Sequence, residues 1–169
     1  MDIIMDVVII SGALTTKNLW YHQEDLFKRK QVHFVDILNS DSITEMASRF
    51  SKIAPKNFTL IGFSMGGYVA LELYRQLPNN IDKLILINTA AKLLSEKGQL
   101  ERERSIDLIN KRKFEFLVKL IFKNSIYDKK KYDLLLPLSQ SMAYEIGPEH
   151  YKKQLQAMLN KPDHAKILS

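Results

Sequence analysis

The sequence contains no cysteine, which excludes a disulfide framework and any metal site built from thiolates. The four histidines (His22, His33, His150 and His164) do not have a spacing suited to a metal ion. The 169 residues also contain no internal repeat and no low-complexity tract. What is left is an ordinary globular composition, with a hydrophobic fraction of 46% that can bury one good core.

Long apolar runs are missing as well. No run approaches the roughly 20 residues that a membrane-spanning helix needs. The N-terminal segment is apolar, but it carries Asp2 and Asp6 instead of the basic residues of a leader peptide. We therefore expect a soluble cytoplasmic protein with no membrane span.

Positive charge is in excess, with a net charge of +6 and a sequence pI near 9.4. The basic runs at 28–30, 111–113 and 129–131 are scattered along the chain, each beside apolar residues in a segment that looks amphipathic. None is interleaved with the aromatic and glycine pattern of an RNA-binding sheet. These runs indicate solvated helix faces, and we expect no nucleic-acid partner.

The first half of the chain alternates between two kinds of segment. Four short apolar runs read as strands, and helix-like spacing separates them at 18–30 and 43–53. The strand candidates are 7–11, 32–38, 58–63 and 83–88. Near-continuous apolar strands separated by helices predict an α/β fold, a mostly parallel sheet covered by helices on both faces, over residues 1–91.

From residue 92 the sequence becomes charged and helical, and no strand of comparable quality follows. The expected helices cover 93–110, 114–122, 130–146 and 148–159. Pro137 is expected to kink or break the third of these, and Gly147-Pro148 marks a stop and restart. Residues 92–169 are therefore predicted to form a second, helical unit.

The run from Thr59 to Leu71 holds the pattern G-x-S-x-G between a strand and a helix. A chain that lifts a serine hydroxyl above the edge of a sheet must turn sharply, which leaves no room for side chains two residues to either side. Gly62 and Gly66 supply that room around Ser64. The serine then precedes a helix, where the free N–H of Met65 points at a developing oxyanion.

The alternative interpretation is a glycine-rich turn with a spectator serine. The context favours a nucleophile, because Phe58–Phe63 reads as an apolar strand and the following helix has an apolar face that ends at Pro78. Ser64 is therefore predicted to be placed for acyl transfer, a reaction that requires no cofactor.

The order of these features resembles the α/β-hydrolase superfamily, in particular its small esterase-like members with a helical cap. Val8 to Leu14, followed by Leu19-Trp20, is similar to the first strand and oxyanion loop of those members, with Ser11 where a histidine often stands. The resemblance implies that Ala13 donates the second oxyanion N–H and that the helices after residue 92 cover an acyl pocket. It implies hydrolysis of carboxylic esters or thioesters with small-molecule acyl groups. We interpret Trp20 as a core residue.

In that superfamily an acid and then a histidine follow the cap. Here residues 160–169 look like the end of the cap, so the chain is expected to be truncated before both, and we assign neither. Asp36 could face the site, but a turn or helix cap is the favoured use of it. Each histidine is more readily explained as a surface or core residue than as the base.

Two classes of function remain open at this point. The chain is either a serine hydrolase whose remaining parts lie elsewhere, or an inactive remnant or binding module that needs a partner chain. In both cases the strand at 83–88 would become an exposed sheet edge, which favours self-association or a partner chain.

Overall fold

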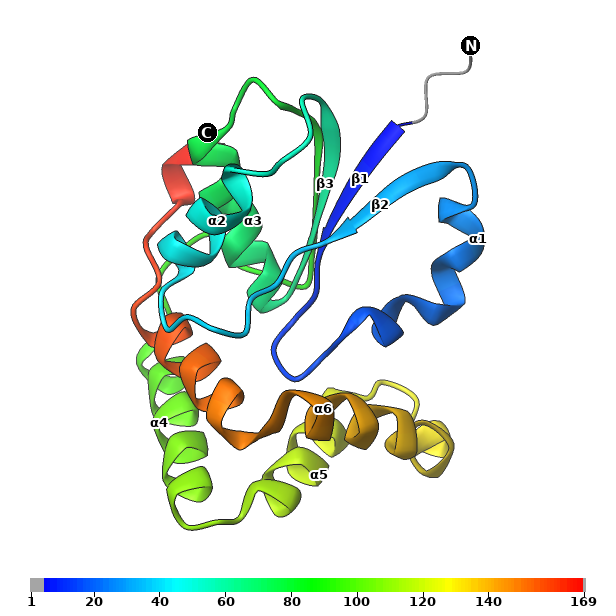
Figure 1. Cartoon of the computed structure of the whole chain (residues 1–169). Helices are drawn as coiled ribbons and strands as arrows, with labels where there is room; N and C mark the ends of the chain where they lie inside the picture. Colours follow the sequence, from blue (N-terminus) through cyan, green and yellow to red (C-terminus); the bar gives the residue numbers. More distant parts are fainter. Residues whose placement is uncertain (1–4, 169) are drawn as a thin grey trace.

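The computed structural model describes residues 5–168 and contains one parallel sheet (Figure 1). Its strand order is β2-β1-β3-β4, so β1 and β3 are central and β2 and β4 are edges. The strands are β1 (Met5–Ile10), β2 (Lys30–Phe34), β3 (Phe58–Phe63) and β4 (Ile81–Ile87). The α/β class with a parallel sheet is confirmed. In residues 5–168, no helix combines the length and hydropathy that crossing a membrane requires.

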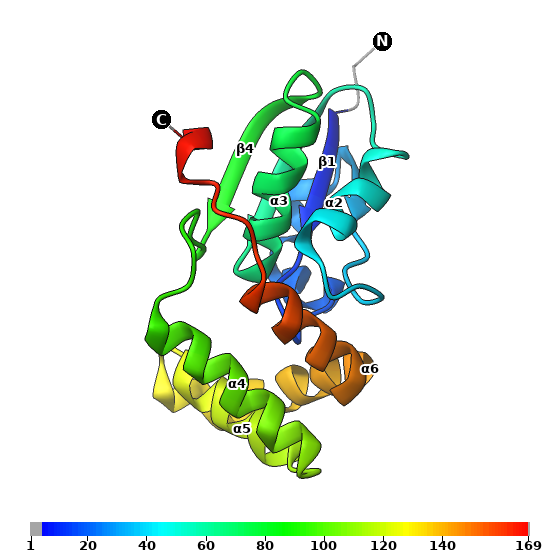
Figure 2. The ribbon, with the colours of Figure 1, turned by 90° about the vertical axis from the view of Figure 1, so that its left-hand side faces the viewer.

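One face of the sheet is packed against α2 (Ile43–Ser51) and α3 (Met65–Gln76) (Figure 2). Val8, Ile10 and Leu60 project into this side and are fully buried. Alternation along a strand sends every second residue to the same face, and here that face meets the apolar sides of two helices. The largest part of the core therefore lies between the sheet and α3.

The other face is covered less completely, by the 3-10 helix η1 (Lys17–Gln23) and the single turn α1 (Glu24–Phe27). Val7, Ile9 and Ile61 pack there against Trp20. On β4 the side chains of Ile85 and Ile87 are 42% and 39% exposed. Helices on both faces are thus confirmed, but the second layer ends before it reaches β4.

The helices after β4 lie together at the end of the sheet where the strands finish (Figures 1 and 2). They are α4 (Glu96–Asn110), α5 (Phe114–Ser125) and α6 (Tyr132–Leu159), with a 3-10 turn η2 (Lys129–Lys131) before α6. Gly147, with φ of 75°, interrupts α6, as Gly147-Pro148 predicted. Residues 160–168 leave α6, run beside α3 and include η3 (Ala165–Leu168).

Three predicted elements differ from the structure. β2 ends at Phe34 instead of residue 38, because the Asp36 carboxylate accepts the Leu38 N–H at 2.8 Å and turns the chain. The expected helix at 18–30 is η1 followed by one turn of α1. Helix α6 runs through Pro137, its sixth residue, with helical backbone angles, although proline removes the N–H that would bond to the carbonyl of Asp133.

Candidate active site

The turn from β3 into α3 places Ser64 in an unusual backbone conformation, with φ 52° and ψ −118°. A residue other than glycine held there costs on the order of 1–3 kcal/mol, so neighbouring groups must hold it in place. The Ser64 N–H donates to the carbonyl of Ile87 at 2.9 Å, and the Thr89 hydroxyl donates to the Ser64 carbonyl at 2.7 Å. The end of β4 therefore clamps the turn from both sides.

Glycines make this turn possible because the backbone around it is in direct contact. A Cβ on Gly66 would lie 2.1 Å from the carbonyl oxygen of Ile10, and one on Gly62 would lie 2.7 Å from the Gly67 Cα. A third glycine, which the sequence pattern did not single out, is constrained by a side chain instead: a Cβ on Gly67 would lie 2.4 Å from the Thr89 hydroxyl oxygen. Only hydrogen fits at these positions.

Ser64 is half-buried immediately before the first residue of α3. The first N–H groups of a helix have no intrahelical acceptor, and the helix dipole makes this end favourable for negative charge. Met65 supplies the first of these groups. The arrangement can stabilise an anion that develops beside the serine hydroxyl.

The loop after β1 lies directly against this turn. A Cβ on Gly12 would be 3.2 Å from the Cβ of Ser64, so the loop and the serine are in van der Waals contact. The Thr15 N–H and hydroxyl both donate to the Gly12 carbonyl, at 3.3 and 2.8 Å. Leu14 within this turn has φ of 58°. Ala13, next to Gly12, is therefore held near Ser64.

The start of the loop is anchored by Ser11, which occupies the position where the resemblance would place a histidine. Its hydroxyl accepts the Trp20 indole N–H at 3.0 Å and donates to the Thr16 carbonyl at 3.4 Å. Trp20 is 8% exposed. Its interpretation as a core residue is confirmed, and it also holds the loop through this bond.

The histidines are all placed away from Ser64. His33 pairs with Asp6 at 2.6 Å, His150 lies 2.9 Å from the Ile146 carbonyl and 3.2 Å from the Asn39 side-chain oxygen, and His164 pairs with Glu72 at 2.7 Å. His22 is exposed and contacts the Tyr21 ring edge-to-face. Asp36 is exposed in its turn. Residues 5–168 thus bring no histidine and no carboxylate into hydrogen-bond contact with Ser64.

The partner of His164 lies on the far half of α3. Both side chains of the His164–Glu72 pair are 2% exposed. Burial acts to raise the pKa of the Glu72 carboxyl, but hydrogen bonds from three side chains outweigh it and lower that pKa to about 2. The three donors are Arg75, Gln76 and His164. The cluster ties the last described segment to α3.

Lys161 and Gln154 are two buried polar residues near the site that the sequence patterns did not reveal. Lys161 donates to the carbonyls of Ala90 and Ala91 at 3.3 and 3.4 Å, and its ammonium lies 4.3 Å from the centre of the Tyr68 ring. Burial lowers the pKa of this lysine. Gln154 bonds to the loop of Gly12. Neither stood in a motif, so only the folded arrangement identifies them.

Two hollows of about 330 and 310 Å³ lie at other places on the molecule, and Ser64 lines neither. Among residues 5–168, no three side chains of the types that bind metals are grouped closely enough to hold an ion. The chemistry that the described arrangement offers is therefore that of a serine hydroxyl beside two backbone segments.

Comparison with known families gives the class of this fold. The family model for the alpha/beta hydrolase fold matches residues 7–115, which include the loop of Gly12, the turn at Ser64 and the first of the helices after β4. The chain belongs to the alpha/beta hydrolase family.

Individual relatives are similar over part of their length. The chain is 30% identical over 128 residues to the biotin biosynthesis bifunctional protein BioHC of Teredinibacter turnerae, which is 62% of this chain and 22% of that protein. It is 28% identical over 102 residues to a pimeloyl-[acyl-carrier protein] methyl ester esterase of Aliivibrio salmonicida, which is 55% of this chain and 39% of that protein. The matched segments thus span well under half of these curated relatives.

Solved structures share the fold over almost the whole chain. A thermophilic esterase from Thermogutta terrifontis has a TM-score of 0.82 at 19% identity, over 96% of this chain and 66% of that one. The enol-lactonase from Burkholderia xenovorans LB400 has a TM-score of 0.80 at 16% identity, over 95% and 66%. About a third of each neighbour's length therefore has no counterpart in these 169 residues.

Proposed function

We propose that this chain supplies the nucleophile and oxyanion hole of a serine hydrolase that cleaves carboxylic esters or thioesters of small-molecule acyl groups. The observation that carries the proposal is the conformation of Ser64, which is strained, clamped by β4 and in contact with the loop of Gly12. The names of two similar proteins, a methyl ester esterase and an enol-lactonase, denote substrates of this class.

In the proposed reaction the Ser64 hydroxyl oxygen attacks the acyl carbon and its proton passes to a general base. The carbonyl oxygen becomes an oxyanion that accepts the N–H groups of Ala13 and Met65. When the intermediate collapses, the acyl–oxygen or acyl–sulfur bond breaks and the alcohol or thiol leaves with the proton. Water then hydrolyses the acyl-serine by the same route.

The reaction also needs a general base and an acid that orients it, and residues 5–168 place neither beside Ser64. We propose that another polypeptide segment supplies them, as the unmatched third of the solved neighbours would allow. Without a base, the serine hydroxyl is a poor nucleophile, and loss of one member of such a triad costs several orders of magnitude in rate. Ser64 should therefore react slowly with an ester or thioester when only residues 5–168 are present.

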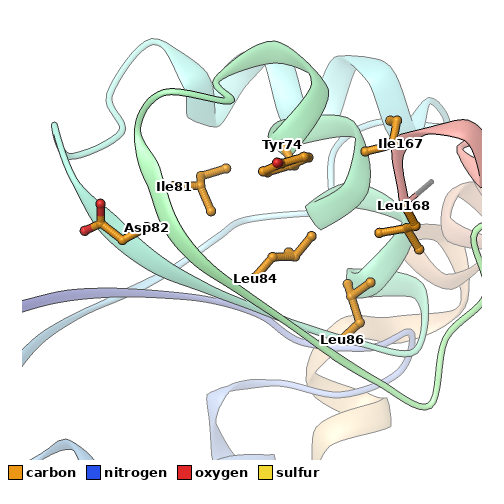
Figure 3. Close-up of a pocket in the computed structure, with 7 residues that line it drawn as sticks. All are labelled: Tyr74, Ile81, Asp82, Leu84, Leu86, Ile167 and Leu168. Carbon is orange, nitrogen blue, oxygen red and sulfur yellow. The ribbon is translucent and has the colours of Figure 1, made fainter.

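The edge of β4 is the proposed docking surface for that segment. A hollow of about 330 Å³ lies beside it, lined by Leu84 and Leu86 of β4, Tyr74 of α3, and Ile167 and Leu168 of η3 (Figure 3). On the opposite face of the same strand, Ile85 and Ile87 are exposed. A strand that pairs with β4 and a helix that covers these side chains would bury both surfaces.

We propose further that residues 1–91 form the catalytic core and residues 92–169 the helical cap over the acyl pocket. Helices α4, α5 and α6 lie at the end of the sheet where the strands finish (Figure 1), and Ser64 directly follows the end of β3. Helix α6 contacts the loop of Gly12 through Gln154. A cap in this position would determine which acyl groups reach the serine.

The second candidate is a binding module or an inactive remnant of a hydrolase. The observation in its favour is that His33, His150 and His164 already hydrogen-bond elsewhere. In that case the β4 edge, or a pocket that the proposed cap would cover, would hold a partner without chemistry.

Labelling with a fluorophosphonate probe separates the two candidates, with Ser64→Ala as control. The probe is applied to the purified chain alone and after addition of any polypeptide encoded immediately downstream. Labelling that requires Ser64, in either sample, is the expected result. A folded protein that does not label under either condition would favour the binding module or remnant.

A further inference from the structure

Gln154 connects helix α6 to the loop beside Ser64. Its side chain is fully buried, and its carbonyl oxygen accepts the backbone N–H of Leu14 at 3.2 Å. The two residues are 140 positions apart in the sequence. A helix of the proposed cap therefore bonds directly to the backbone of the proposed oxyanion loop.

Leu14 needs such support. Its φ of 58° lies in the left-handed region, which is strained for a residue other than glycine. The hydrogen bonds of Thr15 to Gly12 close the turn from within, but they do not engage the Leu14 N–H. Because the Gln154 carbonyl takes that N–H, it fixes the peptide group that follows Ala13.

The side-chain nitrogen of Gln154 indicates that packing alone does not account for a glutamine at this position. Its nitrogen is buried and finds no acceptor among residues 5–168. An unsatisfied buried donor is destabilising, and an apolar side chain of similar volume would avoid that cost. The feature that glutamine provides here and an apolar residue would not is the acceptor for Leu14.

We propose that Gln154 is a positioning residue through which the cap holds the oxyanion loop in its active conformation. The inference deepens the proposed function and rests on it for the role of Ala13. Its consequence is that docking of α6 and orientation of the Ala13 N–H are coupled: when α6 shifts away, the loop loses the bond that supports its left-handed residue.

Two variants separate positioning from packing. Gln154→Met keeps the volume, removes the acceptor and removes the unsatisfied nitrogen. Gln154→Glu keeps a carbonyl oxygen in the same place, and burial favours its protonated form, which retains the acceptor and has one O–H donor in place of the two N–H donors of the amide. Gln156→Met, two residues along on the same helix and only half-buried, is the matched control.

The first readout is amide hydrogen exchange at Leu14, measured by NMR together with the unfolding midpoint. We expect Gln154→Met to speed exchange at Leu14 about tenfold, as loss of one buried hydrogen bond implies, while the midpoint stays or rises. Gln154→Glu should restore protection, and Gln156→Met should change nothing. Unaltered exchange at Leu14 in Gln154→Met, or a drop in the midpoint that accompanies global exchange, would overturn the proposal.

The second readout is the fluorophosphonate labelling rate of Ser64 under the condition in which the unmodified chain labels. We expect Gln154→Met to lower this rate and Gln154→Glu to recover it. Equal rates in a variant with a loosened loop would show that the loop needs no positioning. If the unmodified chain never labels, the proposed function fails by itself, and the exchange data still decide whether Gln154 holds the loop.

Discussion

Two backbone segments meet at Ser64, and they are held in different ways. The turn at Gly62–Gly67 has two hydrogen bonds at Ser64 and is further fixed by contact: at Gly66 the backbone approaches Ile10 so closely that a methyl group has no place. The loop at Gly12–Thr15 is fixed by hydrogen bonds, including one from the distant Gln154. Close packing cannot loosen without moving strands, whereas a hydrogen bond can open locally. The turn that carries Ser64 can thus shift only together with the strands. The loop of Gly12, in contrast, needs a hydrogen bond from α6 to keep its conformation.

The largest expected effect comes from filling the space at the rigid turn. Gly66→Ala should lower the free energy of unfolding by about 3 kcal/mol, because the new methyl group would meet the backbone at the end of β1. Urea denaturation measures the change.

The matched control is Gly98→Ala in the first turn of α4, where the new Cβ would find its nearest atom at 3.4 Å. Alanine should raise stability there by about 0.5–1 kcal/mol, since it reduces the entropy of the unfolded chain. If both glycine variants had similar stability, the rigid turn would not be determined by contact.

The second-largest effect is expected from substitutions of Ser64 itself, where the backbone is strained. Ser64→Gly should be more stable than Ser64→Ala by about 1–2 kcal/mol, because glycine adopts the observed φ and ψ without strain. Both variants should fail to label with fluorophosphonate. Thermal unfolding compares the two, and equal midpoints would mean that the turn stores no strain.

The third prediction concerns the far end of α3, where Glu72 is buried with His164. The pKa of Glu72 is lowered to about 2 in the folded protein from an ordinary value of 4.5. Its contribution to stability is therefore complete above pH 4.5 and is lost as the pH falls toward 2.

Glu72→Gln should lower stability at pH 7 and should flatten the dependence of stability on pH between 4.5 and 2. Denaturation across that pH range measures both, with Glu115→Gln as the control because Glu115 is exposed on α5. An unchanged pH profile in Glu72→Gln would show that other carboxylates dominate acid unfolding.

The smallest expected effect is at Gly12, in the loop that hydrogen bonds hold. A Cβ on Gly12 would lie 3.0 Å from the edge of the Phe63 ring and 3.2 Å from the Ser64 Cβ, contacts that a small shift can relieve. Gly12→Ala should therefore cost about 1 kcal/mol, clearly less than Gly66→Ala. A loss equal to that of Gly66→Ala would show that the loop is packed as tightly as the turn.

Local patterns allowed the prediction of most of the sheet and of the turn at Ser64. Phe58–Phe63 forms β3 with the predicted bounds, and Ser64 follows it with glycine on either side at the predicted spacing. The strand and the turn depend on residues that are close together in the sequence, so the residue types in that short stretch are enough to predict both. The early end of β2 was harder to predict from the sequence. The Asp36 side chain accepts the Leu38 N–H, which a continued strand would have used for pairing.

The sequence by itself determined the alternation of strands and helices, the sharp turn at Ser64 and the interruption at Gly147, because each follows from backbone freedom and side-chain size over a short stretch. Only the tertiary structure decided that His164 pairs with Glu72 and that Gln154 reaches Leu14. These contacts join residues far apart in the chain. Their partners are chosen by how the packed layers meet, and no periodicity or local motif records that choice.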